Sequence, residues 1–136
     1  MLRTLLVLTA LVPSAVQARE VTILCDVRLT QGERAGTPST RQYILDDERK
    51  TITSVMPDGS LVALCSADPA MCDMNYSPEA ITYTMYLGNT RGPNTIRFSL
   101  NRLSGQIVET WDITAFRFNN SVAGTCQAAT PANRRF

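Results

Sequence analysis

The chain has 136 residues, enough for one domain, and its 13 Lys and Arg residues nearly balance its 12 Asp and Glu residues. This neutrality argues against a nucleic-acid partner, which would need a basic face to release counterions, and gives no reason to expect attraction to anionic membranes. The absence of histidine removes Ser–His and Cys–His nucleophile pairs, most transition-metal sites and the commonest general base.

The N-terminus has the pattern of a signal peptide. An apolar run at residues 5–12 follows a basic residue, and the small residues up to Ala18 suit cleavage at that point. The run is too short for a permanent membrane helix, which needs about 20 residues. We therefore expect a signal peptide at 1–18, with an uncleaved anchor as the alternative, and a single exported domain at 19–136. Such a domain would be periplasmic or secreted and would not touch the membrane after cleavage.

Short segments with β-strand character follow, separated by polar turns. The alternation of apolar and polar residues at 21–29 is typical of a half-buried strand. Four further strands are predicted in the segments 41–45, 51–56, 61–65 and 79–87. Between them lie a polar loop, a charged turn, a Pro-Asp-Gly turn and an irregular stretch with at most one helical turn, at residues 30–40, 46–50, 57–59 and 66–78.

A hairpin is predicted at residues 94–113, supplying the sixth and seventh strands. Apolar and polar residues alternate in its first strand, and Gly105 can take the positive φ that a tight turn needs. An eighth strand is expected at 116–127, with a break near Asn119-Asn120 as an option. These short strands predict an all-β fold, an antiparallel up-and-down meander of about eight strands in a small closed or nearly closed barrel, lipocalin-like in shape.

Four cysteines in an exported chain predict two disulfides, for which three connectivities are possible. Cys25 lies in the first predicted strand and Cys126 in the last, while Cys65 and Cys72 bracket a proline-containing loop. We expect the pairs Cys25–Cys126, which would lock the closure of the barrel, and Cys65–Cys72. A metal or redox site is the alternative, but the spacing is not C-x-x-C and no histidine completes a mixed zinc site. No metal and no cofactor are therefore predicted.

Two acidic features invite a functional interpretation. Asp46-Asp47-Glu48 could be a calcium site, but a solvated hairpin turn with backbone capping is the preferred interpretation. Glu109 shares a strand face with Trp111, so a closed barrel would bury its carboxylate and require a partner, such as Arg97 or Arg102. Glu109 could orient a ligand inside a cavity. A structural ion pair, or a bulge that turns Glu109 outward, is the alternative.

The stretch between Cys65 and Tyr83 carries adaptable apolar side chains, which could form a binding loop or a lid over the barrel mouth. They could equally cap the end of the core, and Trp111 is more readily explained as a core residue than as a stacking platform. The residues expected to contact a ligand are Glu109, Trp111, Arg97, Met71, Met74 and Tyr76. No catalytic residue is predicted.

Several short motifs occur in a recognisable order. They are Leu24-Cys25, Tyr43-Ile-Leu-Asp-Asp47, Leu100-Asn-Arg-Leu-Ser-Gly105, Gly124-Thr-Cys126 and the terminal Arg135-Phe136. In this order the chain resembles small secreted or periplasmic β-rich proteins of proteobacteria. The resemblance implies a β-meander and periplasmic export. That group has no established activity, so the resemblance carries over no functional residue.

These observations favour a non-catalytic exported binding module, for a small apolar or amphipathic ligand held in the barrel or at its mouth. The alternative is a periplasmic protein-binding module, such as a hydrolase inhibitor, that contacts its partner through residues 30–40 or 66–78. An enzyme that uses only carboxylates or hydroxyls is a third interpretation. We expect the protein to be a monomer.

Overall fold

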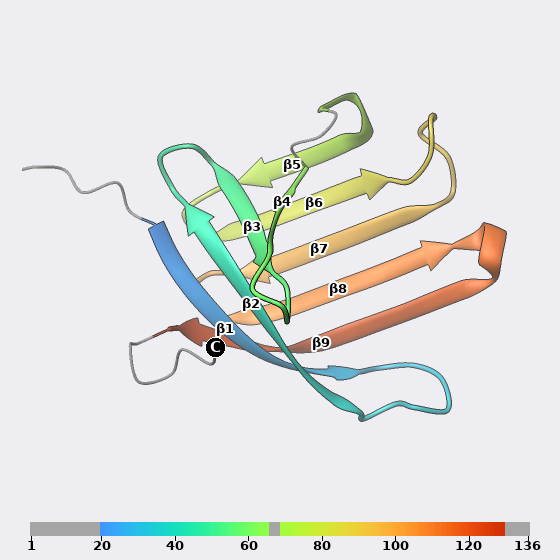
Figure 1. Cartoon of the computed structure of the whole chain (residues 1–136), viewed down its shortest axis with the longest axis horizontal. Helices are drawn as coiled ribbons and strands as arrows, with labels where there is room; N and C mark the ends of the chain where they lie inside the picture. Colours follow the sequence, from blue (N-terminus) through green and yellow to red (C-terminus); the bar gives the residue numbers. More distant parts are fainter. Residues whose placement is uncertain (1–19, 66–68, 130–136) are drawn as a thin grey trace, which may run out of the picture.

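Nine antiparallel strands form one sheet that is bent into a half-barrel (Figure 1). The computed structural model describes residues 20–65 and 69–129, so the predicted signal peptide lies outside the described residues. The strands are β1 (Glu20–Leu29), β2 (Pro38–Asp46), β3 (Thr51–Val55), β4 (Leu61–Leu64), β5 (Cys72–Tyr76), β6 (Ala80–Tyr86), β7 (Thr95–Asn101), β8 (Gln106–Ile113) and β9 (Phe118–Ala128). Two short 3-10 turns are η1 (Pro69–Met71) and η2 (Thr114–Phe116). Within the described residues, no helix is long and apolar enough to cross a membrane.

The first and last strands pair in the middle of the sheet. The strand order is β4-β3-β2-β1-β9-β8-β7-β6-β5, and Cys25 lies directly opposite Cys126. The predicted all-β meander and the meeting of its terminal strands are therefore confirmed. The edges of the sheet are β4 and β5, which are consecutive along the chain. The opening of the nearly closed barrel therefore lies between these two strands.

Both predicted disulfides are present. Cys25–Cys126 joins β1 to β9 across the centre of the sheet, and Cys25 is completely buried. Cys65–Cys72 links the end of β4 to the start of β5, the two edges of the opening. Two disulfides are typical of a protein from an oxidising compartment. One bridge thus reinforces existing strand pairing, whereas the other joins edges that no ladder joins.

The prediction of an irregular stretch at 66–78 is wrong for its second half. There, β5 pairs with β6 in an antiparallel ladder. Cys72, Met74 and Tyr76 face inward, while Asp73 and Asn75 are exposed. Asp and Asn have low β propensity, but the ladder and the three inward side chains outweigh it. The expected helical turn shrinks to η1.

Two strand boundaries also differ from the prediction. β2 begins at Pro38 instead of Arg41, because β1 is long enough to offer ladder partners back to Arg28. β9 runs unbroken through Asn119-Asn120, which pair with Asp112 and Trp111 of β8. In both cases a neighbouring strand supplies hydrogen bonds that the local sequence does not reveal.

The core lies on the inner face of the bent sheet. Its buried apolar side chains come from seven of the nine strands and are Ile23, Cys25, Val27, Tyr43, Leu45, Ile52, Ile81, Tyr83, Phe98, Leu100, Ile107 and Val122. Phe98 of β7 stacks on Tyr83 at 5.0 Å between ring centroids and meets Tyr43 of β2 edge-on at 5.4 Å. These aromatic contacts hold β2 over β6 and β7, and each such pair contributes about 0.5–1.5 kcal/mol beyond its buried area.

Two glycines permit the close packing around the central strand pair. Gly105 has the positive φ predicted for the β7–β8 turn, +74°, and its carbonyl accepts a 2.7 Å hydrogen bond from the Cys126 amide. A Cβ on Gly105 would collide with the Cys126 carbonyl, and one on Gly124 would collide with the Asp26 carbonyl. Only glycine fits at both positions, because backbone from another strand occupies the space of the side chain.

We expect the two disulfides to contribute unequally to stability. Replacing Cys25 and Cys126 with alanine should lower the free energy of unfolding by about 4–5 kcal/mol, and replacing Cys65 and Cys72 by about 2–3 kcal/mol, since the first bridge closes a far longer loop. Urea denaturation of both double variants measures the difference. Equal losses would show that loop length does not set their contributions.

Candidate functional site

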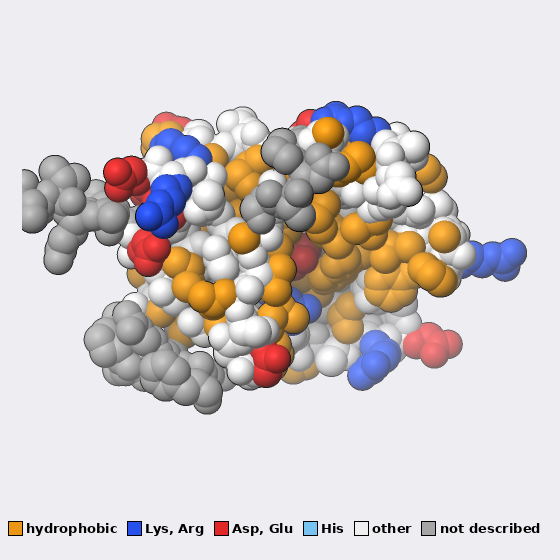
Figure 2. Space-filling view, turned by 45° about the horizontal axis from the view of Figure 1, so that its top comes forward, with side chains coloured by type: hydrophobic (Ala, Val, Ile, Leu, Met, Phe, Trp, Pro, Cys, Tyr) orange, Lys and Arg blue, Asp and Glu red, His pale blue; other side chains and the backbone are white. Residues whose placement is uncertain are grey.

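The inner face of the half-barrel is incompletely covered. Several inward-facing apolar side chains are only partly buried, among them Leu29, Met74, Met85, Ile96 and Trp111. Figure 2 shows hydrophobic side chains gathered on the walls of a hollow, with acidic and basic side chains between them. Met85, Ile96 and Trp111 lie opposite one another on neighbouring strands of the inner face, and Glu109 and Arg41 face the same side. We call this part of the inner face the mouth. A concave apolar surface with a few polar groups is the usual character of a ligand site.

Glu109 of β8 faces into the half-barrel, as the sequence suggested. Its ladder partners are Phe98 on β7 and Val122 on β9, both buried, and the ladders run unbroken past it, so no bulge turns it outward. The Tyr43 hydroxyl donates a 3.2 Å hydrogen bond to Glu109 Oε2. Among the described residues this is the carboxylate's one hydrogen bond.

The prediction that Arg97 or Arg102 pairs with Glu109 is wrong. Arg97 lies opposite Thr84 and Thr110, on the outer face of the sheet, and is exposed. Arg102 is engaged elsewhere, with Asp47. Consecutive residues of a strand point to opposite faces, so a residue next to Phe98 in sequence cannot share the face of Glu109.

The cation that acts on Glu109 is Arg41 of β2, which was not among the predicted partners. Arg41 alternates with Tyr43 and Leu45, so all three share the inner face, and Arg41 Nη1 donates a 2.8 Å hydrogen bond to Ser39 Oγ. The same alternation in the sequence could have flagged Arg41 and Tyr43 as inward. Their proximity to Glu109 could not be read there, because it depends on the bend of the sheet.

Burial has the largest effect on the ionisation of Glu109. Desolvation raises the pKa of Glu109, while the charge of Arg41 and the hydrogen bond from Tyr43 act in the opposite direction without cancelling it. Burial also raises the pKa of Tyr43 and of Tyr83, and the Glu109 charge raises both further. Both tyrosines are therefore neutral at physiological pH, and Tyr43 serves as a hydrogen-bond donor.

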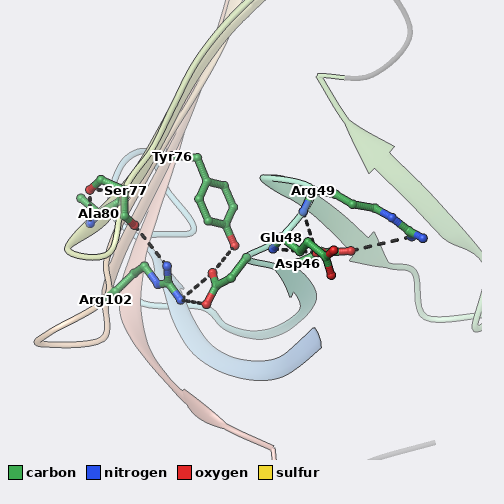
Figure 3. A network of polar contacts seen from close by, with 8 residues as sticks. Asp46, Glu48, Arg49, Tyr76, Ser77, Ala80 and Arg102 are labelled. Atoms are coloured by element: carbon green, nitrogen blue, oxygen red, sulfur yellow. Dashed lines mark hydrogen bonds and ion pairs between the residues drawn. The ribbon is translucent and has the colours of Figure 1, made fainter. Parts of the chain in front are cut away.

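A polar network spans the other end of the half-barrel, where the β2–β3 and β7–β8 turns lie and which we call the closed end (Figure 3). Asp47, in the β2–β3 turn, forms a 2.8 Å ion pair with Arg102 and accepts a 2.8 Å hydrogen bond from the Tyr76 hydroxyl. Arg102 Nη1 also donates to the Ser77 carbonyl at 3.1 Å. The network joins the β2–β3 turn to the end of β5 and to the β7–β8 turn, three segments that share no ladder.

The acidic cluster at 46–48 is a structural turn. Asp46 is buried, and its carboxylate accepts hydrogen bonds from the amides of Glu48 and Arg49 at 3.0 and 2.9 Å. Asp47 points instead toward Arg102, so the carboxylates do not converge. No group of three or more potential metal ligands occurs within residues 20–65 and 69–129. The predicted backbone capping is confirmed for Asp46, and the cross-barrel role of Asp47 was missed.

Two further hollows accompany the mouth. A cavity of about 210 Å³ lies at the closed end, lined by Val21, Ile23, Leu45, Leu100, Arg102, Gly105, Cys126, Gln127 and Ala128. A groove of about 680 Å³ runs along β5–β8. The lining of the groove includes outward, mainly polar side chains such as Asp73, Asn75, Thr82, Thr84, Arg97 and Ser99. Neither hollow contains the inward carboxylate.

The residues expected to contact a ligand are only partly brought together. Trp111 lies two residues beyond Glu109 on the same face, opposite Ile96, and Met74 also faces inward. Tyr76 faces inward too, but its hydroxyl belongs to the network at the closed end. Met71 is half-buried in η1, and Arg97 is outside the mouth.

The loops expected to contact a protein partner are described only in part. Residues 31–36 are exposed, in a loop pinned by the 2.8 Å hydrogen bond from the Gly36 amide to the Leu29 carbonyl. Of the second candidate, residues 66–68 lie outside the described part of the chain, and β5 occupies much of the rest. No binding element for a protein is therefore singled out.

No protein-family model matches the chain, and comparison with curated proteins and with solved structures finds no significant match. The site must therefore be interpreted from its own chemistry. Among inward-facing residues of the described chain, Glu109 offers a carboxylate, Arg41 a guanidinium and Tyr43 a hydroxyl. Together they can hydrogen-bond a polar group within an apolar surround.

We expect Asp47→Asn to lower the free energy of unfolding by about 1–2 kcal/mol at neutral pH, because it removes a charged acceptor from a partly exposed network. The hydrogen bond from Arg102 lowers the pKa of Asp47, so its contribution is complete above the ordinary aspartate value and disappears as the pH falls through the lowered pKa. Urea denaturation across the acid range should show the wild type and the variant converging. Glu48→Gln, an exposed change in the same turn, is the control and should leave stability unchanged.

The raised pKa of Glu109 makes stability depend on pH in the opposite direction to the lowered pKa of Asp47. Its native state holds the proton more tightly than the unfolded chain, so stability falls as the pH rises from the ordinary glutamate value through the raised pKa. Glu109→Gln keeps an acceptor for Tyr43 and should unfold at a higher urea concentration than the wild type at pH 8, with the gap narrowing on acidification. A gap that is constant with pH, or that widens in acid, would contradict the burial of this carboxylate.

Proposed function

We propose that this chain is a non-catalytic binding module that holds a small amphipathic ligand in the mouth of its half-barrel. The observation that carries the proposal is the Glu109–Tyr43 hydrogen bond, a polar pair set among apolar side chains that the fold leaves partly exposed. A ligand with an apolar body would cover these side chains, gaining about 25 cal/mol for each Å² of apolar surface removed from water.

A non-catalytic role agrees with the chemistry of the mouth. Carboxylate-based catalysis normally uses two acidic groups with different protonation states. On the inner face of the described sheet, Glu109 is accompanied by Arg41 and neutral tyrosines, which can bind and orient a polar group. We place the protein in the periplasm or outside the cell, because its disulfides suit an oxidising compartment and its N-terminal sequence resembles a signal peptide.

Titration with decan-1-ol, followed by the fluorescence of Trp111, tests the proposal. Trp111 is the chain's one tryptophan and lies in the mouth, so occupancy should change its emission saturably. Ile96→Arg, opposite Trp111, should abolish the change, because it fills the mouth with a charged side chain. Ser99→Arg is the matched control on the same strand, since Ser99 faces outward and is exposed.

Two results would overturn the proposal. One is the absence of a saturable fluorescence change in the wild type. The other is equal loss of binding in Ile96→Arg and Ser99→Arg, which would place the alcohol away from the inner face. Urea denaturation of each variant verifies that it remains folded at the titration conditions.

A further inference from the structure

Two opposite charges face the mouth without forming an ion pair. The described ion pairs with N···O distances up to 4.0 Å are Arg49–Asp46, Arg91–Asp73 and Arg102–Asp47. Arg41 and Glu109 therefore stand more than 4.0 Å apart, although the charge of Arg41 acts on Glu109. Arg41 belongs to β2 and Glu109 to β8, the strands on either side of the central pair β1 and β9.

The Arg41 guanidinium and the Glu109 carboxylate can each form further hydrogen bonds. A guanidinium has five N–H donors, and Arg41 uses one of its nitrogens to bond Ser39 within the described chain. A carboxylate accepts at both oxygens, and Glu109 uses Oε2 to bond Tyr43. A group placed between the two could donate to Glu109 and accept from Arg41 at the same time.

The charges of Arg41 and Glu109 sum to zero within a mostly apolar wall. A ligand head carrying a net charge would leave an uncompensated charge in this low-dielectric setting, which is costly. A neutral head that both donates and accepts hydrogen bonds leaves the balance intact. The half-buried Met85, Ile96 and Trp111 provide an apolar surface for the rest of the molecule.

We propose that the mouth selects amphipathic ligands whose polar head is uncharged and both donates and accepts hydrogen bonds, an amide being the simplest case, bound between Glu109 and Arg41. This inference rests on the proposed function and specifies its ligand class. The apolar chain of the ligand lies along Met85, Ile96 and Trp111, and the mouth selects among polar heads by their charge.

Four probes with the same ten-carbon chain test the selection: decanamide, decan-1-ol, decanoate and decylammonium. At about pH 8 the acid and the amine are both charged. Trp111 fluorescence should give dissociation constants for the amide and the alcohol that are about tenfold lower than those for either charged probe. Binding of the alcohol alone tests the proposed function, and the ranking of the four heads tests this inference.

Charge variants show whether Glu109 and Arg41 set the ranking. Glu109→Gln leaves Arg41 uncompensated, so decanoate should gain about tenfold and decylammonium should lose. Arg41→Gln should have the opposite effect, and the double variant should restore preference for neutral heads. Arg97→Gln, which removes an equal charge from the outer face, is the matched control and should leave the ranking unchanged.

Several results would overturn the inference while leaving the proposed function intact. Equal affinity for all four probes would show that chain length alone governs binding. A ranking that Glu109→Gln and Arg41→Gln do not change, or that Arg97→Gln changes equally, would show that the pair does not select the head. If one single variant fails to fold, the other, compared with Arg97→Gln, still decides the question.

Discussion

The structure depends on the pairing of its first and last strands. β1 and β9 form the centre of the sheet, where Cys25 is bonded to Cys126 and Gly124 lets the two backbones approach. Because these two strands pair, all nine strands belong to one continuous sheet. The same pairing places the discontinuity of the barrel in mid-chain, between β4 and β5, and so determines where the half-barrel is open.

Where the two halves of the bent sheet face each other, no backbone ladder joins them and side chains hold them together. At one end, Asp47 reaches across to Arg102 and Tyr76; in the middle, Tyr43 contacts Phe98; and at the sheet edges Cys65 is bonded to Cys72. Such contacts fix the halves at a few points and leave space between them. In this arrangement the apolar side chains of the mouth remain half-exposed.

The orientation of Glu109 could be predicted from the strand pattern, but its neighbours are known only from the fold. The strand alternation predicted that it would face inward, and the ladders with Phe98 and Val122 confirm this. Its partner was wrongly expected among the arginines nearby in sequence. The actual neighbours, Tyr43 and Arg41, come from a strand more than sixty positions away. Their position against Glu109 makes the mouth polar at one point and apolar around it.

The all-β class, most of the strands, both disulfide pairs and the glycine turn at Gly105 could be predicted from the sequence. These features depend on local periodicity, turn chemistry and cysteine placement, which are properties of neighbouring residues. The fold was needed to show that β5 is a strand, that the opening lies between β4 and β5, and that Asp47 bridges the closed end. The fold was also needed to show which groups surround Glu109. Those features depend on how far the sheet bends and which distant strands face one another, and this is set by the sum of many weak packing contacts that no single segment of sequence encodes.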